Sequence, residues 1–125
     1  MKVLLSIKPE FVDSIQNGDK QYEYRKIIFR RPDITTIVVY ATKPRGKVIG
    51  EFEIGEILED NPEELWQATK KKAGITEDFF KEYFFNRDRG FAIKINSFIE
   101  YDEPLDLYQI SESLRVPPQS FCYIE

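Results

Sequence analysis

The chain has 125 residues, the usual length of one domain, and its 42% hydrophobic and 14% aromatic residues suffice for one core. It has no histidine and one cysteine, Cys122, which excludes Ser-His-Asp and Cys-His catalysis, an internal disulfide and an ordinary zinc site. The net charge of −4 argues against strong non-specific binding of duplex DNA, although residues 1–50 hold ten Lys or Arg against five Asp or Glu.

The first half of the chain predicts four strands and one helix. Pro9 suits the first turn of a helix and Asn17-Gly18 suits its end, while β-branched residues dominate the segment ITTIVVYAT. Alternating apolar residues indicate a long strand in the segment KVIGEFEIGEIL. The expected elements are strands at 2–7, 21–27, 34–42 and 47–58 and a helix at 9–17.

The second half predicts mainly helices followed by a strand. Asn61 and Pro62 have the residue types of a helix start, and Thr76 is expected to cap a second helix. The expected elements are a helix from 61 to the lysines at 70–72, a helix at 77–84, a strand at 90–102, a short helix or irregular return at 104–114, and an extended edge segment at 117–125. We expect four aromatic residues of the two helices to be mostly buried: Trp66, Phe79, Phe80 and Tyr83.

Together these elements predict one α+β domain spanning residues 1–125. Its mixed sheet would have about 5–6 strands, partly closed into a β-barrel and flanked by about 3–4 short helices. The opening segment MKVLLSI is too short for a signal sequence, and no later stretch is apolar enough to cross a membrane. With a single cysteine, these features favour a cytoplasmic location, no membrane partner, no metal and no cofactor, and leave the oligomeric state open.

The segment QYEYRKI raises the question of what its charged residues do. A period of two places Glu23 and Arg25 on one face of the strand and Tyr22 and Tyr24 on the other. One interpretation is an exposed ion pair, worth about 0–1 kcal/mol. The other is that the tyrosines pack toward the core while Glu23 and Arg25 form the floor of a polar cleft.

A longer pattern favours the cleft. The motif G-x-K-x-x-E-x-R occurs here as Gly18, Lys20, Glu23 and Arg25, and further blocks follow in order: SIKPEFVDSIQNGDKQYEYRK, VVYAT, VIGEFEI, ELW, GITEDFFKEYF, GFAIKI and PPQSF. Over nearly the whole chain these blocks resemble the ASCH domain, a family of the PUA-like superfamily. The resemblance implies a small β-barrel with a cleft at the first strand–helix junction, and RNA, nucleotide or nucleoside ligands.

We therefore expect a ligand-binding cleft with two groups of residues. Arg25 offers a planar set of donors for phosphate or a base edge, lysine offers a mobile charge, and Glu23 can accept from an exocyclic amine. The cleft would contain Lys8, Lys20, Glu23 and Arg25, with neutral hydrogen bonds added by Thr42, Gln119 and Ser120. We also expect Arg25→Ala to leave folding nearly intact, because its guanidinium would serve the ligand.

The favoured function is RNA or nucleotide binding in this Lys/Glu/Arg cleft, in RNA metabolism or translation regulation. The alternative is a hydrolase, in which Lys20 and Glu23 would be catalytic. One branch of the family removes the acetyl group from acetylcytidine with a Lys-Thr-Glu set; here Glu23 occupies the threonine position and no glutamate matches the third residue. A metal-independent ribonuclease remains an alternative, and a protein-interaction module using residues 108–114 and the terminal strand is a third.

Overall fold

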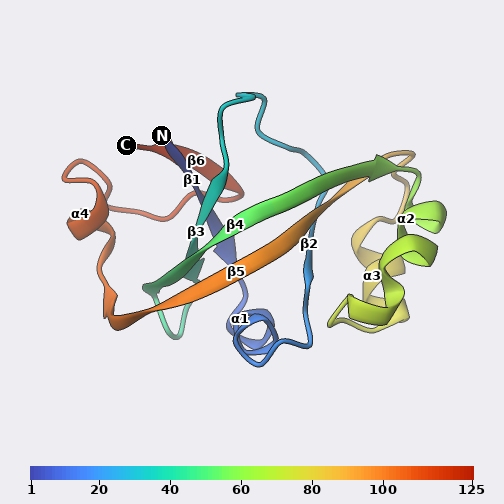
Figure 1. Ribbon diagram of the computed structural model, residues 1–125, viewed down its shortest axis with the longest axis horizontal. Coiled ribbons are helices and arrows are strands. Elements are labelled where there is room, and N and C mark those ends of the chain that lie inside the picture. Colours follow the sequence, from blue (N-terminus) through green and yellow to red (C-terminus); the bar gives the residue numbers. More distant parts are fainter.

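Six strands form one curved sheet in the computed structural model, which describes residues 1–125 (Figure 1). The strand order is β2-β5-β4-β3-β1-β6, with β1 parallel to β3 and every other neighbouring pair antiparallel. The strands are β1 (Lys2–Ile7), β2 (Tyr22–Arg25), β3 (Thr36–Ala41), β4 (Lys47–Asp60), β5 (Gly90–Leu105) and β6 (Phe121–Ile124). The predicted mixed α+β sheet of about 5–6 strands is confirmed.

The helices are short, namely α1 (Pro9–Gln16), α2 (Pro62–Thr69), the 3₁₀ turn η1 (Lys70–Lys72), α3 (Glu77–Tyr83) and α4 (Leu107–Ile110). Most of them lie at the two ends of the antiparallel β4–β5 pair, with α2, η1 and α3 in the connection between these strands (Figure 1). As predicted, the side chains of Asn61 and Thr76 accept hydrogen bonds from backbone N–H groups in the first turns of α2 and α3. The segment 104–114 contains the short helix α4, as one of the two expected forms, and β5 continues to Leu105, beyond the strand end expected at residue 102. None of the helices is long and apolar enough to span a membrane.

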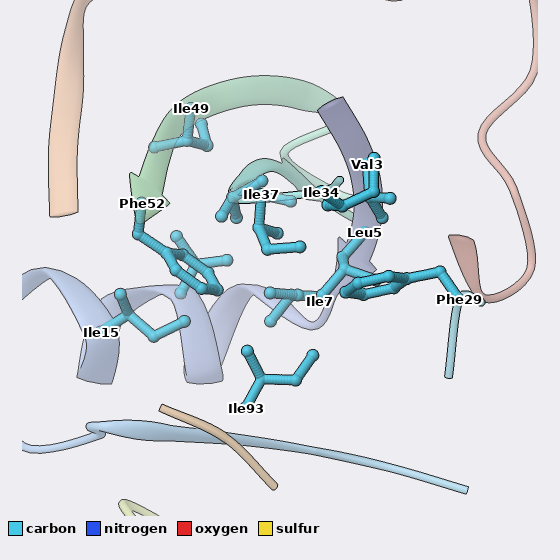
Figure 2. Packing of buried hydrophobic residues seen from close by; sticks show 13 residues of the cluster. Val3, Leu5, Ile7, Ile15, Phe29, Ile34, Ile37, Ile49, Phe52 and Ile93 are labelled. Carbon is cyan, nitrogen blue, oxygen red and sulfur yellow. The ribbon is translucent and has the colours of Figure 1, made fainter. Parts of the chain in front are cut away.

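The main core fills the inner side of the curved sheet. Figure 2 shows its side chains converging from β1, β3 and β4, with Ile15 of α1 and Ile93 of β5 closing the cluster. A second cluster joins α2 and α3 to β2 and β5, and includes Tyr24, Leu65, Phe80 and Phe84. Neither core fills the space over β2 between α1 and α3. The candidate site lies in this space.

The sheet stays open, because β2 and β6 are its two edges and share no backbone ladder. Register shifts in the β4–β5 pairing allow these long strands to bend. The chain following β2 nevertheless reaches β6: the Tyr123 hydroxyl accepts hydrogen bonds from the backbone N–H groups of Arg30 and Arg31. Side-chain contacts therefore link the two sides of the barrel where backbone pairing is missing.

Candidate functional site

A pocket of about 290 Å³ opens between α1 and α3 over β2, and we call it the central pocket. Its walls come from the end of β1, the start of α1, β2, the residue ahead of α3's cap, and α3 itself. The lining residues are Ser6, Ile7, Lys8, Phe11, Lys20, Glu23, Tyr24, Arg25, Ile75, Phe79 and Tyr83. The structure thus brings together four of the residues expected in the cleft: Lys8, Lys20, Glu23 and Arg25.

The alternation of β2 explains how two charged side chains come to face this pocket. Tyr24 borders the pocket but belongs to the second core, where its ring meets Phe80 edge-on at 5.0 Å and its hydroxyl lies 2.7 Å from the Thr69 hydroxyl. Burial raises the pKa of Tyr24 to about 12, so this phenol stays protonated at neutral pH. Because neighbouring residues on a strand point to opposite sides, anchoring Tyr24 directs Glu23 and Arg25 toward the pocket.

Lys20, Glu23 and Arg25 form a buried charged cluster, which we call the charged triad. Their exposed fractions are 2%, 6% and 8%. One Glu23 carboxylate oxygen lies 2.9 Å from Arg25 Nη2, and the other lies 3.7 Å from Lys20 Nζ. The interpretation of Glu23 and Arg25 as an exposed ion pair is therefore wrong, and the alternative of a polar cleft agrees with their burial. The triad holds two buried cations against one buried anion.

Arg25 also joins strands that share no backbone ladder. Its Nη2 donates to the Ser6 carbonyl of β1 at 2.8 Å, just beyond the point where the pairing of β1 with β6 ends at Leu5. Its Nε is buried and has no hydrogen-bond partner in the protein. This geometry argues against the expectation that Arg25→Ala leaves folding intact, since the guanidinium connects β2 with β1 as well as facing the pocket.

Lys20 is held by a segment far along the chain. Its ammonium donates to the Ala73 carbonyl at 3.2 Å, and Gly74 packs against its aliphatic part. A Cβ on Gly74 would collide with the Cβ of Lys20, and Gly74 also has a φ of +66°, so glycine is required there twice over. Burial lowers the pKa of the Lys20 ammonium, and the nearby Glu23 carboxylate opposes that shift.

Aromatic rings form the walls above the charged triad. Phe11 and Phe79 meet edge-on at 5.1 Å, and the ammonium of the exposed Lys8 lies 5.3 Å from the centre of the Phe79 ring. Tyr83 closes the other side and has Lys26 Nζ 4.7 Å from its ring centre. Rings of this kind offer flat faces for stacking, and the cations around them favour an anionic ligand.

The predicted burial of the helix aromatics holds only in part. Phe80 is buried, while Trp66 and Tyr83 are half-buried against the second core. Phe79 is half-buried too, but it contacts Phe11 at the pocket instead of joining the second core. Helical spacing could identify an aromatic helix without showing which of its rings faces the pocket.

Three residues expected in the cleft lie outside the pocket lining: Thr42, Gln119 and Ser120. The backbone N–H of Thr42 donates to the Ile7 carbonyl, and the Ser120 carbonyl accepts from the N–H of Ser6. Gln119 is exposed. The contacts of Thr42 and Ser120 are backbone contacts that hold the chain near β1, so the geometry does not support a side-chain role in the pocket for any of the three.

Comparison with known proteins places this architecture in a family. The family model described as "ASCH domain" matches residues 5–108. The chain belongs to the ASCH domain family. A relative from Zymomonas mobilis named "ASCH domain-containing ribonuclease" is 28% identical over 98% of this chain and 84% of its own.

Solved structures support the same assignment. The crystal structure of ASCH from Zymomonas mobilis superposes with a TM-score of 0.88 at 28% identity, covering 99% of this chain and 87% of that one. The N-terminal domain of Staphylothermus marinus McrB superposes with a TM-score of 0.52 at 14% identity, covering 90% of this chain and 80% of that one. The second likeness shows a shared fold alone.

The triad generates a stability prediction. Glu23→Gln should lower the free energy of unfolding by about 3–5 kcal/mol, because it removes the only carboxylate beside two buried cations. Asp33→Asn is the matched control, because the side chains of the Arg31–Asp33 pair are about half exposed and their interaction should contribute little to stability. Urea denaturation measures both, and equally small losses would contradict the buried triad.

The lowered pKa of Lys20 predicts a pH dependence. Between that lowered pKa and the ordinary lysine value of 10.5, the unfolded chain holds a proton that the folded chain has released. Stability therefore rises with pH in that window, so the unfolding free energy of the native chain should increase relative to that of Lys20→Met. Denaturation of both proteins at several pH values up to 10.5 measures the difference. Lys43→Met, at an exposed loop residue, is the control and should keep the pH dependence of the native chain. If Lys43→Met loses the rise in stability as Lys20→Met does, burial of Lys20 is not its cause.

Proposed function

We propose that this ASCH domain binds single-stranded RNA by inserting one nucleotide into the central pocket. The observation that carries the proposal is the buried excess of positive charge in the triad, beneath aromatic walls. Burying an uncompensated charge is unfavourable, so an anionic ligand that completes the set would recover part of that cost. A nucleotide combines such an anion with a planar ring.

The pocket's groups match the parts of a nucleotide. The rings of Phe79 and Tyr83 suit stacking against a base, and the Glu23 carboxylate can accept from an exocyclic amine such as that of cytosine. Lys8 lies exposed at the mouth, where a phosphate would remain in contact with water. A base inside a duplex cannot enter such a pocket without being unstacked, which favours unpaired RNA as the ligand.

The other expected functions find less support in the site. The pocket lining contains no threonine, and the Ser6 hydroxyl already donates to the Pro118 carbonyl at 2.7 Å, so the acetylcytidine amidohydrolase lacks its nucleophile. The hypothesis of a protein-interaction surface at residues 108–114 is weakened, because Ile110 and Leu114 of this segment already pack against the outer face of the sheet.

Ribonuclease activity is the second candidate, favoured by the name of the Zymomonas mobilis relative. A buried lysine of lowered pKa could accept the proton of a 2′-hydroxyl as that oxygen attacks the adjacent phosphorus. The P–O5′ bond would break, the leaving oxygen would take up a proton, and a 2′,3′-cyclic phosphate would remain. Glu23 beside Lys20 opposes deprotonation of the amine, which is why we place binding first.

Fluorescence anisotropy with a labelled single-stranded RNA tests the binding proposal. Affinity should fall as salt rises, and Lys8→Ala should reduce the slope of log K against log salt by about 0.7, the value for one phosphate contact on a single strand. Lys20→Met should weaken binding about tenfold or more, since the loss of a good polar contact costs about 1–3 kcal/mol. Arg31→Ala removes an equal charge from an exposed pair and is the control.

Two outcomes would contradict the proposal. If Arg31→Ala weakens binding as much as Lys8→Ala does, general charge and not the central pocket governs affinity. If the same RNA is shortened in the presence of EDTA, and the products end in 2′,3′-cyclic phosphate only when Lys20 is intact, the domain is a ribonuclease instead of a binding module.

A further inference from the structure

A second pocket lies on the other side of α3, and we call it the helix pocket. It has a volume of about 370 Å³, in the lower part of the range of small-ligand sites. Its aromatic floor consists of the half-buried Trp66 with the buried Phe80 and Phe84. The other lining residues are Asn61, Pro62, Glu63, Gln67, Glu77, Lys81 and Arg87.

α3 forms a shared wall between the two pockets. Phe79 and Tyr83 face the central pocket, and the adjacent Phe80 and Phe84 face the helix pocket. Such a division follows from helical geometry, because residues four apart lie on one face and their neighbours are turned about 100° away. The two pockets are therefore separated by the width of one helix, a span that one flexible strand can cross.

Two cations connect the pockets at the end of α3. Arg87 lines the helix pocket, and its Nη2 reaches the Lys26 carbonyl at 3.5 Å. The Lys26 ammonium lies over the ring of Tyr83, which lines the central pocket. Both side chains are exposed, so a phosphate passing from one pocket to the other would meet positive charge.

We propose that the helix pocket holds a second base of the same single-stranded RNA, with the linking phosphate over Lys26 and Arg87. This proposal rests on the proposed function and specifies its ligand as an oligonucleotide. We assign a base and not a phosphate to this pocket, because its floor is aromatic and its charges balance, with Glu63 and Glu77 set against Lys81 and Arg87. The Glu77 carboxylate is paired with Lys81 Nζ at 3.2 Å.

The Glu63 carboxylate lines the pocket and takes part in no salt bridge or side-chain hydrogen bond, so it can accept from an amine-bearing base such as cytosine. The side-chain oxygens of Asn61 and Gln67 already accept from the Glu64 N–H and from Lys70 Nζ.

Trp66 provides a direct reporter, since it is the only tryptophan of the chain. Its fluorescence should be quenched by short oligocytidylates of about two to six nucleotides but not by cytidine monophosphate, which fills the central pocket alone. Affinity should rise about tenfold from the monophosphate to an oligomer that reaches both pockets, as expected for one added base–aromatic stack. Equal affinity for both ligands, without quenching, would overturn the inference.

Arg87→Ala and Arg89→Ala form a matched pair of variants. Both side chains are exposed, but Arg89 pairs with Glu59 and does not line the helix pocket. Arg87→Ala should weaken oligocytidylate binding about fivefold or more and leave monophosphate binding unchanged, whereas Arg89→Ala should change neither. Equal effects of the two variants would refute the bridging role of Arg87.

The two proposals fail in different ways. If neither the monophosphate nor any oligomer binds, both the proposed function and the second base site are wrong. If both bind with the same affinity, Trp66 fluorescence is unchanged and Arg87→Ala has no effect, the central pocket remains the binding site and the helix pocket does not contact the ligand.

Discussion

The ion pair between Glu23 and Arg25 is the constraint on which the rest of this structure depends. It lies where the sheet is open, and Arg25 extends from it to the Ser6 carbonyl, so one guanidinium connects β2 to β1 where no backbone ladder does. Lys20 forms an ion pair with the same carboxylate, and its ammonium also donates a hydrogen bond to the Ala73 carbonyl. The open side of the sheet is thus bridged by these charged side chains and by the Tyr123 hydroxyl instead of by strand pairing.

Such an arrangement is costly for a small domain, because two buried cations share one carboxylate. A well-packed apolar cluster of similar size would be at least as stabilising. The surplus charge is better explained by a ligand that arrives from outside, and the aromatic rings of α1 and α3 surround the place where it would sit. On this account, the same residues bridge the open barrel and attract an anionic, planar ligand.

Local signals predicted the framework well and the pocket only in part. Pro9 and Thr76 set the starts of α1 and α3 through the chemistry of helix ends, and strand alternation placed Glu23 beside Arg25. No local signal linked Gly74 to Lys20, because that contact joins segments that lie far apart in the sequence. For the same reason the pocket-facing position of Phe79 was missed, since spacing defines a helix face but not its partner.

Side-chain ¹⁵N NMR of the arginine Nε–H groups tests the central claim most directly. Arg25 Nε is buried without a protein partner beside the pocket, so its signal reports on that site, while the exposed Arg31 serves as an internal reference. On addition of cytidine monophosphate, the account predicts a shift of the Arg25 signal and slower exchange of its proton with water, with Arg31 unchanged. An unchanged Arg25 signal at saturating ligand, or equal shifts in both arginines, would contradict it.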